Sequence, residues 1–462
     1  MTQLPPNLDL DSLPDRLALP EWSRTAGKPP LDVTIRPPGS KSLTNRALLL
    51  AALSCGESVI EHPLVEADDA QRMLGAIQNL GATVKLEGSK LTITGTGGVL
   101  RVDPNDPVID LNNAGTATRF LSAAALLADH PITITGNARM QERPIRELGD
   151  LLTQLGAEVE YLKSDGCPPI RITPPKDLTQ MPTRIEIQPT QSSQFVSALM
   201  LVAPSLPNGL TISQPNGITS ESYVRMTIEL LDSIGVRVQH SGDLSTVRIS
   251  PPSKRVNLEI EPDASGATYW WTAGALLPDS LVRVQGLDLE HANQGDARFP
   301  LLLEQMGCTL VSGEGTLACR GRETLSPIMC DMRDMPDAVM SLAIAACFAG
   351  GTTIIRGVRT LRVKECDRIE ALKVELAKIG VEVTDNLGGD DDALSITPPR
   401  LWAGFDSSNP IVMHTYDDHR MAMSLSLLAL RLPGIVIDDP KCVAKTYPGF
   451  YQDLARVYDI TQ

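Results

Sequence analysis

The sequence lacks any long apolar run. No window approaches the roughly 18 unbroken apolar residues that a membrane helix needs, and the first residues, MTQLPPNLDLDSLPDR, contain neither the basic region nor the apolar stretch of a secretory signal. The 462 residues are 42% hydrophobic, 21% charged and only 4% aromatic, which suits two or three globular domains. We therefore expect a cytoplasmic protein that is neither secreted nor bound to a membrane.

Basic residues are also in short supply. There are 41 Lys and Arg against 56 Asp and Glu, which gives a formal net charge of −15. Broad binding of nucleic acid depends on a dense basic surface, so we expect no nucleic-acid partner. An anionic ligand would need a local basic pocket instead.

The cysteines form no CxxC pair, and several lie inside apolar runs. Free thiols packed as small apolar side chains in a reducing compartment are therefore predicted, with a disulfide or zinc framework as the alternative. The eight cysteines are Cys55, Cys167, Cys308, Cys319, Cys330, Cys347, Cys366 and Cys442.

The most prominent feature of the sequence is an internal repeat. A helix-like stretch that ends in Gly and continues into a strand recurs as NLGATVKL, QLGAEVEY, SIGVRVQH, QMGCTLVS and KIGVEVTD. Glycine is the usual residue just past a helix end, because the chain there takes a positive φ. The glycines are Gly81, Gly156, Gly235, Gly307 and Gly380, spaced by 75, 79, 72 and 73 residues.

A second element, a strand, a short turn and an apolar helix, recurs six times with the same period, as in PVIDLNNAGTATRFLSAAALL and IVMHTYDDHRMAMSLSLLAL. Each unit reads as strand, helix, strand, helix and one or two further strands, an α/β pattern. Because these helices are apolar nearly all round, we expect them to form cores beneath sheets. An open solenoid is the alternative, but such arrays usually have shorter periods.

Two globular clusters of three units fit this period best. We expect one domain at residues 39–260 and a second at residues 29–38 plus 261–462. Residues 1–28, rich in Pro and polar residues, are predicted to be a flexible extension.

Several units place basic residues in the first turn of a helix. Cations there oppose the helix dipole, whereas the free N–H groups suit phosphate or carboxylate. A single such residue could be a solvated surface charge, but the recurrence favours a shared anion-binding cleft. The basic residues at these turns are Lys41, Arg46, Arg119, Lys364, Arg368 and Arg420, and Arg143 and Lys445 lie in nearby loops.

Two carboxylates stand out against this basic set. Asp337, in MPDAVM, is either a helix N-cap or a functional acid. Glu365, in RVKECDRIE, is either half of a surface ion pair or an acid and base. His419 is predicted to be a buried, hydrogen-bonded imidazole rather than a proton carrier, and Trp270 and Trp271 are predicted core residues.

The motifs GSKSLTNRALLLAAL, NAGTATR, QERPI, SSQF, LRVKECDRIE, YDDHRMAMSLSLLAL and DPKCVAKTYP occur in order between about residues 32 and 457. With them the sequence resembles the 5-enolpyruvylshikimate-3-phosphate synthase family. The resemblance implies an α/β fold, a two-domain inverse α/β barrel with three βαβαββ repeats in each domain. It also implies transfer of the enolpyruvyl group of phosphoenolpyruvate to the 5-hydroxyl of shikimate 3-phosphate, with release of phosphate, in aromatic amino acid biosynthesis.

The resemblance further implies two sets of ligands for these anions. The expected contacts of shikimate 3-phosphate are Lys41, Ser42, Arg46, Ser192, Ser193, Gln194, Ser220, Asp337 and Lys364. The expected contacts of phosphoenolpyruvate are Lys41, Asn113, Gly115, Arg119, Arg143, Arg368, Arg420 and Lys445.

In the family mechanism C3 of the enol is protonated and the 5-hydroxyl attacks C2, which gives a tetrahedral adduct that eliminates phosphate. By resemblance Asp337 takes the hydroxyl proton, Glu365 is the leading acid and base at C3, and Lys41 shares in proton transfer. No cofactor and no metal are expected. We expect a monomer, although acidic proteins of this kind also occur as dimers.

Two positions depart from the family pattern. Phe120 stands where Pro is common, and Thr360 and Leu361 stand where Asn-Trp is common. Phe120 bears on glyphosate, the family's competitor of phosphoenolpyruvate, because in sensitive members the inhibitor packs against the glycine equivalent to Gly115. We predict inhibition, but weaker than in a Phe120→Pro variant.

Two other functions fit part of the pattern. The related transferase acting on UDP-N-acetylglucosamine shares the fold, but it commonly uses a loop cysteine in the first half of the chain, and none lies between Cys55 and Cys167. A non-catalytic repeat scaffold would explain the period but not the basic helix starts.

Overall fold

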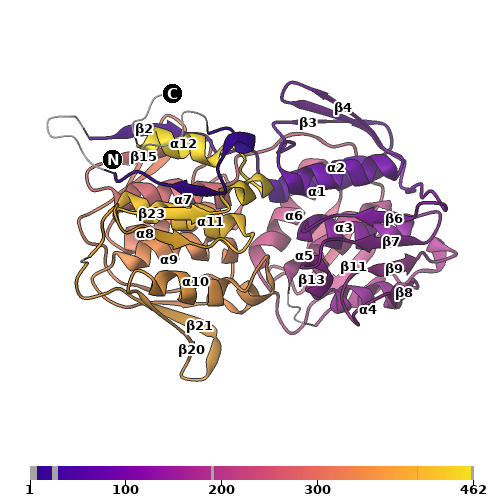
Figure 1. The fold of residues 1–462 in the computed structure, drawn as a ribbon. Helices are drawn as coiled ribbons and strands as arrows, with labels where there is room; N and C mark the ends of the chain where they lie inside the picture. The colour runs from indigo at the N-terminus through magenta and orange to yellow at the C-terminus, as the bar shows by residue number, and fades with distance from the viewer. Residues whose placement is uncertain (1–7, 23–29, 189–191, 403, 459–462) are drawn as a thin grey trace. The chain divides into compact units, whose positions relative to one another are not determined.

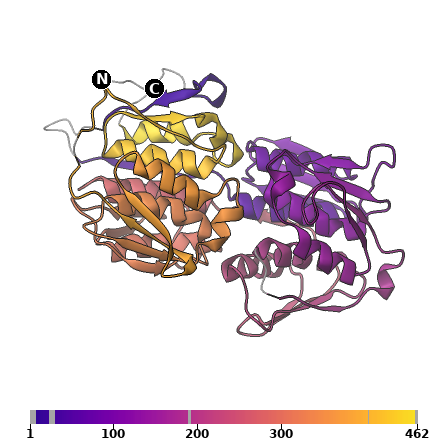
Figure 2. The ribbon, with the colours of Figure 1, turned by 60° about the horizontal axis from the view of Figure 1, so that its bottom comes forward.

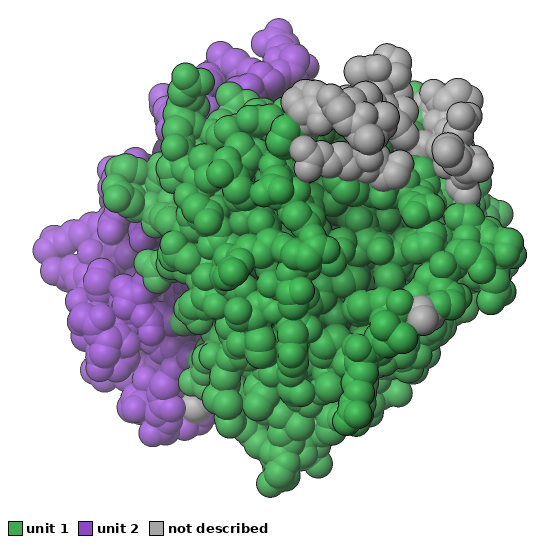
Figure 3. All heavy atoms as spheres, turned by 90° about the vertical axis from the view of Figure 1, so that its left-hand side faces the viewer, with its two compact units in different colours: residues 1–38, 262–462 green, residues 39–261 purple. Residues whose placement is uncertain are grey.

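The computed structural model describes residues 8–22, 30–188, 192–402 and 404–458 (Figure 1). The chain forms two compact units. Unit 1 comprises residues 1–38 and 262–462, and unit 2 comprises residues 39–261 (Figure 3).

Unit 2 contains three copies of a βαβαββ unit. Its strands and helices are α1 (Lys41–Leu53), β3 (Glu57–Glu61), α2 (Asp68–Asn79), β4 (Thr83–Glu87), β5 (Lys90–Thr94), β6 (Val108–Asp110), α3 (Gly115–Ala124), β7 (Ile132–Thr135), α4 (Arg146–Gln154), β8 (Glu158–Tyr161), β9 (Ile170–Thr173), β10 (Arg184–Glu186), α5 (Ser193–Val202), β11 (Leu210–Ser213), α6 (Glu221–Ser233), β12 (Val238–His240), β13 (Thr246–Ile249) and β14 (Asn257–Glu259).

The three sheets of unit 2 share one strand order. In β6-β7-β9-β8 the first two strands are parallel, and β9 is antiparallel both to β7 and to the edge strand β8; the sheet β10-β11-β13-β12 repeats this pattern. The first copy has the order β14-β3-β5-β4, so its first strand comes from the far end of the unit. The strand β14 pairs in parallel with β3 and so closes unit 2 on itself.

Unit 1 repeats the same plan. Its strands and helices are β1 (Arg16–Ala18), β2 (Asp32–Ile35), α7 (Ala264–Leu276), β15 (Leu281–Gln285), α8 (Phe299–Gln305), β16 (Thr309–Gly313), β17 (Thr316–Arg320), β18 (Met329–Asp331), α9 (Val339–Cys347), β19 (Thr353–Arg356), α10 (Arg368–Ala377), β20 (Glu382–Leu387), β21 (Asp390–Thr397), β22 (Ile411–Met413), α11 (His419–Ser426), β23 (Ile435–Asp438) and α12 (Phe450–Val457).

The N-terminal part of the chain completes two sheets of unit 1. The strand β2 pairs in parallel with β15 and is the first strand of the fourth copy. The sixth copy has the order β22-β23-β1, in which β1 lies antiparallel to β23, where the other copies have their own hairpin strand. In Figure 2 the indigo N-terminal strand lies against the yellow C-terminal part of the chain.

The prediction of a flexible extension over residues 1–28 is wrong for residues 8–22. Leu8, Leu13, Leu17 and Leu19 are at most 2% exposed, and they belong to the hydrophobic core of unit 1. The polar and proline content of the segment masked these four leucines, and Leu17 lies in β1, the strand that completes the sheet of the sixth copy. The remainder of the predicted extension, residues 1–7 and 23–28, lies outside the described residues.

The helices that follow the first strand of each copy are the core, as predicted. The helices α1, α3 and α5 pack on one another in unit 2, and α9 packs against α7 and α11 in unit 1. Every residue of α7 and α9 is buried, including Trp270 and Trp271. The second helices, such as α4, instead bury one face only, because their apolar residues follow a single stripe.

The repeat glycines take the predicted conformation. Gly81, Gly156, Gly235, Gly307 and Gly380 all have positive φ, between 78° and 100°, just beyond a helix. The eight cysteines are free thiols, as predicted. Among the described residues no helix is long and apolar enough to cross a membrane.

Candidate active site

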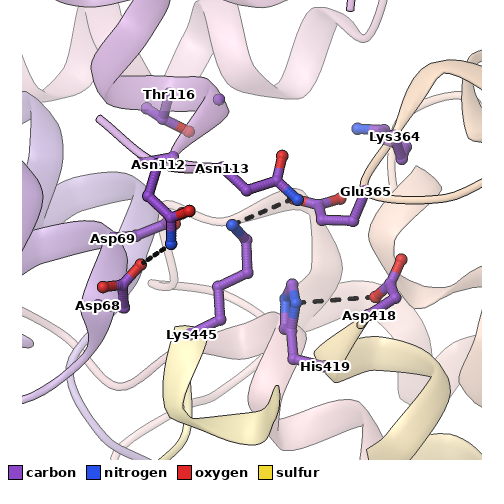
Figure 4. Close-up of polar contacts among 12 residues, drawn as sticks. Asp68, Asp69, Asn112, Asn113, Thr116, Lys364, Glu365, Asp418, His419 and Lys445 are labelled. Atoms are coloured by element: carbon purple, nitrogen blue, oxygen red, sulfur yellow. Dashed lines mark hydrogen bonds and ion pairs between the residues drawn. The ribbon is translucent and has the colours of Figure 1, made fainter. Parts of the chain in front are cut away.

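The predicted site residues fall into two groups, one in each unit. In unit 2, Lys41 is the first residue of α1, directly after the N-cap Ser40. Its side chain is 11% exposed, and its Nζ lies 3.5 Å from Oδ2 of Asp69, a carboxylate that is 2% exposed. The neighbouring Asp68 accepts a hydrogen bond from Asn112 (3.2 Å), which Figure 4 shows. A buried lysine thus has a carboxylate beside it at the start of α2.

Arg46 lies one turn later on α1 and is 2% exposed. Its Nε donates to Thr227 Oγ1 (2.8 Å), and its Nη1 donates to the carbonyl of Ser42 (2.9 Å). Its Nη2 donates to Ser197 Oγ (3.0 Å) and to the carbonyl of Tyr223 (3.3 Å). Most of its five N–H donors are therefore engaged within unit 2.

Phe120 packs its ring on this guanidinium. The ring centroid lies 5.3 Å from Cζ of Arg46, and Phe120 is completely buried on α3. Burial lowers the pKa of Arg46 to about 10, because the charged form is stripped of water. The departure at Phe120 thus bears on Arg46 as well as on the neighbouring turn.

Two arginines contact the turn before α3 and its first residue, Gly115. Arg143 Nη1 donates to Asn113 Oδ1 (3.1 Å), and Arg119 Nη1 donates to the carbonyl of Gly115 (3.3 Å). A Cβ at Gly115 would lie 2.7 Å from Nη2 of Arg143. The absence of a side chain at Gly115 therefore leaves room for the guanidinium of Arg143 beside the start of α3.

The predicted polar residues of the third copy begin two helices. Ser192 caps α5 by accepting from the amide N of Gln194 (3.2 Å), and Ser193 follows it. The Gln194 side chain donates to Thr116 Oγ1 on α3 (3.3 Å). Ser220 precedes α6 in a left-handed conformation, with φ 49°.

In unit 1 the central residue is Asp337, in the short 3-10 helix η7 (Pro336–Ala338). Its Oδ2 accepts from Arg420 Nη2 (2.8 Å). Its Oδ1 lies 3.2 Å from Arg368 Nη1 and 3.4 Å from Lys364 Nζ. Asp337 lies inside η7, whose N-cap is Met335, and the N-cap of α9 is Ala338, so Asp337 is the N-cap of neither helix.

Glu365 lies between Arg368 and a second cation, Lys445. Its Oε2 accepts from Arg368 Nη2 (3.0 Å). Its Oε1 lies 3.9 Å from Lys445 Nζ (Figure 4). The side chain is 7% exposed, so it is not the surface ion pair that was the alternative. Lys445 ends the 3-10 helix η10 (Pro440–Lys445) and is itself 9% exposed.

Arg368 is held in place by Asp418. Burial opposes its charge, but Asp418, Glu365 and Asp337 together raise the pKa of Arg368 above its ordinary value. His419, beside Asp418, is completely buried, as predicted, with Nδ1 3.7 Å from Asp418 Oδ1 (Figure 4).

The sequence analysis missed several residues at these contacts. Asp418 and Asp69 each stand beside another aspartate in the sequence, and nothing there marked which one would face a cation. Tyr269 was missed because it looked like another core aromatic. Its hydroxyl lies 3.5 Å from Arg420 Nη1, and burial raises its pKa to about 12. Thr360 lies in η8 (Arg359–Val363), with no partner for its Oγ1 among the described residues.

The comparisons with known proteins identify the family. The model of the EPSP synthase family, 3-phosphoshikimate 1-carboxyvinyltransferase, matches residues 25–454. The chain belongs to the EPSP synthase family. A 3-phosphoshikimate 1-carboxyvinyltransferase of Salmonella schwarzengrund is 40% identical over 434 residues, which cover 92% of this chain and 96% of the relative. One from Citrobacter koseri is 40% identical over 431 residues, with the same coverage.

Solved structures agree with this assignment. EPSP synthase from Acinetobacter baumannii has a TM-score of 0.71 and 25% identity, and the match covers 93% of this chain and 96% of that one. The enolpyruvyl transferase NikO from Streptomyces tendae has a TM-score of 0.68 at 20% identity and shares the fold. The predicted family, its α/β fold and its transferase function are confirmed, and the matches favour neither the UDP-N-acetylglucosamine enzyme nor a non-catalytic scaffold.

Proposed function

We propose that this EPSP synthase family member transfers the enolpyruvyl group of phosphoenolpyruvate to shikimate 3-phosphate through Asp337, Glu365 and Lys41. The observation that carries the proposal is the surroundings of Asp337, which has the cations of Arg420, Arg368 and Lys364 within 3.4 Å. Each substrate carries a phosphate and a carboxylate, so a cluster of cations suits both.

The substrates are assigned to the residues by matching motif. Shikimate 3-phosphate contacts Lys41, Ser42, Arg46, Ser192, Ser193, Gln194, Ser220, Asp337 and Lys364. Phosphoenolpyruvate contacts Lys41, Asn113, Gly115, Arg119, Arg143, Arg368, Arg420 and Lys445. Cytoplasmic location and a monomeric state stay predictions.

Addition begins with two proton movements. The carboxylate of Asp337 takes the proton of the 5-hydroxyl as its oxygen attacks C2, and Glu365 gives a proton to C3. Arg368 and Arg420 orient Asp337, since both donate to it at 3.2 Å or less. The product of this step is a tetrahedral adduct with an intact C–O bond to phosphate.

Elimination reverses the proton movement at C3. Glu365, now a carboxylate, removes a C3 proton while the C2–O bond to phosphate breaks, and inorganic phosphate leaves with the proton that Asp337 took from the 5-hydroxyl. Lys445 Nζ lies 3.9 Å from Oε1 of Glu365, so it faces the carboxylate that the addition step leaves. Lys41, with Asp69 at 3.5 Å, shares proton transfer.

The experiment that tests the proposal is phosphate release. Phosphate should appear only when both phosphoenolpyruvate and shikimate 3-phosphate are present. Release with UDP-N-acetylglucosamine in place of shikimate 3-phosphate would favour the related transferase. No release with either acceptor would reject the proposed reaction.

A further inference from the structure

Glu375 is a carboxylate of unit 1 that the proposed mechanism does not use, and its side chain is completely buried near the end of α10. Both of its oxygens bind the segment that joins β22 to α11. Oε2 accepts from the backbone N–H of His414 (2.8 Å), and Oε1 accepts from the hydroxyl of Tyr416 (2.8 Å). A buried carboxylate needs hydrogen-bond donors around it, and here two of them come from this one segment.

Lys378, three residues after Glu375, supplies the counter-charge. Its Nζ donates to Oε2 of Glu375 and also to the carbonyl of Val412 in β22 (2.9 Å). A carboxylate and an ammonium group therefore join the end of α10 to β22 and to the residues that follow it. These bonds leave the Glu375 side chain little freedom to turn away.

The segment bound by Glu375 contains a strained turn. Tyr416 and Asp417 follow one another in the left-handed region, with φ of 57° and 53°, and we call this pair the left-handed turn. Aspartate tolerates that region, but a bulky residue such as tyrosine rarely enters it and persists there where its surroundings hold it. Tyr416 is 42% exposed, so burial of its ring fixes it only in part. Its hydroxyl bond to Glu375 adds the missing restraint.

The left-handed turn leads directly into Asp418. The amide N of Asp418 donates to the carbonyl of Thr415 across the turn (3.0 Å), and its side chain caps α11 by accepting from the amide N of Arg420 (2.9 Å). The same carboxylate accepts from Arg368, and the Arg420 side chain donates to Asp337. The course of the backbone through the turn thus sets where both Asp418 and Arg420 point.

Helix α10 is joined to this segment at two points. Arg368, its first residue, holds Asp418, and Glu375, seven residues later, holds the turn that precedes Asp418. Residues seven apart lie on the same face of an α-helix, about two turns or roughly 10 Å from one another along its axis. One face of α10 therefore fixes both the Asp418 carboxylate and the backbone that carries it.

We propose that Glu375 is a positioning residue of the transferase, which holds the left-handed turn in place. Through that turn it directs Asp418 and Arg420 toward the groups that they bind. This rests on the proposed function, in which Asp337 takes the proton of the 5-hydroxyl. Glu375 acts through the turn and takes no part in proton transfer itself.

The first test follows the turn itself and needs no substrate. Glu375→Leu keeps the bulk of the side chain but removes both acceptor oxygens, so the amide of His414 loses its partner. Hydrogen exchange in the peptide that spans residues 411–420, read by mass spectrometry, should become several-fold faster, while the peptide of β15 should keep its rate. An unchanged rate in residues 411–420 would overturn the proposal.

The second test is steady-state kinetics on folded protein. In Glu375→Leu the kcat should fall about tenfold or more, because a misplacement of about 1 Å can cost up to a hundredfold. The KM for phosphoenolpyruvate should rise several-fold, since Arg368 and Arg420 are assigned to that substrate. A mere loss of folded protein would lower the maximal rate without changing KM. Tyr416→Phe removes one hydroxyl from a half-exposed residue and should show the same changes on a smaller scale, so it decides the matter if Glu375→Leu does not fold.

A conservative variant tests whether the bonds of Glu375 are what matters. In Glu375→Gln the amide oxygen can keep the bonds from His414 and Lys378, while its NH₂ group donates to the hydroxyl oxygen of Tyr416. This variant should recover most of the kcat that Glu375→Leu loses. If it is as slow as Glu375→Leu, the hydrogen bonds to the turn are not the cause and the positioning role is overturned.

The matched control is Tyr451→Phe, the same chemical change as Tyr416→Phe at a tyrosine that is 1% exposed. Its hydroxyl lies 3.3 Å from Oγ of Ser426, the last residue of α11. This variant should lose stability but keep kcat and both KM values.

The failure of this inference differs from the failure of the proposed function. Parental kcat and KM in both Glu375→Leu and Tyr416→Phe, in a protein that releases phosphate with both substrates, would overturn the positioning role alone. A parent protein that releases no phosphate with both substrates would reject the proposed function, and the exchange test would still report whether Glu375 holds the turn.

Discussion

Arg368 and Asp418 form a two-point ion pair inside unit 1. Nε of Arg368 donates to Oδ2 of Asp418 at 2.8 Å and Nη2 donates to Oδ1 at 3.2 Å, and neither side chain is more than 1% exposed. The remaining donors of Arg368 reach Asp337 and Glu365. One buried pair thus orients both carboxylates to which proton transfer is assigned.

Asp418→Asn should therefore destabilise the protein by about 3 kcal/mol, because a buried arginine loses its main counter-charge. Turnover should fall as well, since Arg368 would no longer hold both acids. The matched control is Asp390→Asn, which breaks the exposed pair between Arg356 and Asp390 (2.8 Å) and should cost less than about 1 kcal/mol. If urea unfolding gave equal losses of unfolding free energy for the two variants, the buried pair would contribute no more to stability than the exposed pair.

Asp337→Asn and Glu365→Gln should each cut turnover about a hundredfold or more, the usual range for a positioned acid or base, in a protein that still folds. The control Glu370→Gln changes a half-exposed carboxylate in the first turn of α10, which begins three residues after Glu365; it is paired with Lys373 at 3.4 Å and should keep normal turnover. Steady-state kinetics with a calorimetric binding check decide the matter. Near-normal turnover in either variant removes that residue from the mechanism.

Gly115→Ala places a methyl group 2.7 Å from Nη2 of Arg143, so the guanidinium must shift. KM for phosphoenolpyruvate should rise several-fold, and the inhibition constant of glyphosate should rise more, because the inhibitor is larger than the substrate. The control Gly75→Ala, on α2, meets no atom within 4 Å and should change neither constant. Unchanged constants in Gly115→Ala would separate this turn from the phosphoenolpyruvate site.

Leu17→Ala tests the contribution of the N-terminal strand to unit 1. Leu17 is 1% exposed and is paired with Ile437 of β23, so the variant should lose about 2 to 5 kcal/mol of unfolding free energy. Leu401, at 76% exposure, provides the matched change. Leu401→Ala should stay within about 0.5 kcal/mol of the parent, and a similar result for Leu17→Ala would mean that β1 contributes nothing to stability.

Periodic features of the fold were accessible from the sequence because local chemistry sets them. Gly307 and Gly380 mark helix ends since positive φ favours glycine, and the apolar helices around Trp270 have to be buried. The origin of the third strand of the sixth copy was not accessible. It depends on Leu17 reaching β23 across more than 400 residues, and no local pattern encodes that pairing.

In the candidate site too, some residues could be predicted from the sequence and others could not. Lys41, Arg368 and Arg420 were visible as cations at helix starts, where the dipole disfavours them. Their counter-charges were not visible, because Asp69 and Asp418 are ordinary aspartates until the fold places a cation beside them. Arg46 was seen as an anion ligand, but its position beneath Phe120 depends on how α1 and α3 pack.

The most direct measurement is phosphate release by the purified protein with phosphoenolpyruvate and shikimate 3-phosphate together, compared with each substrate alone and with Asp337→Asn. Stoichiometric phosphate and enolpyruvyl product are expected only with both substrates, with turnover at least a hundredfold lower in the variant. Phosphate release that needs no shikimate 3-phosphate, or that Asp337→Asn leaves unchanged, would contradict the assignment of this carboxylate as the base of enolpyruvyl transfer.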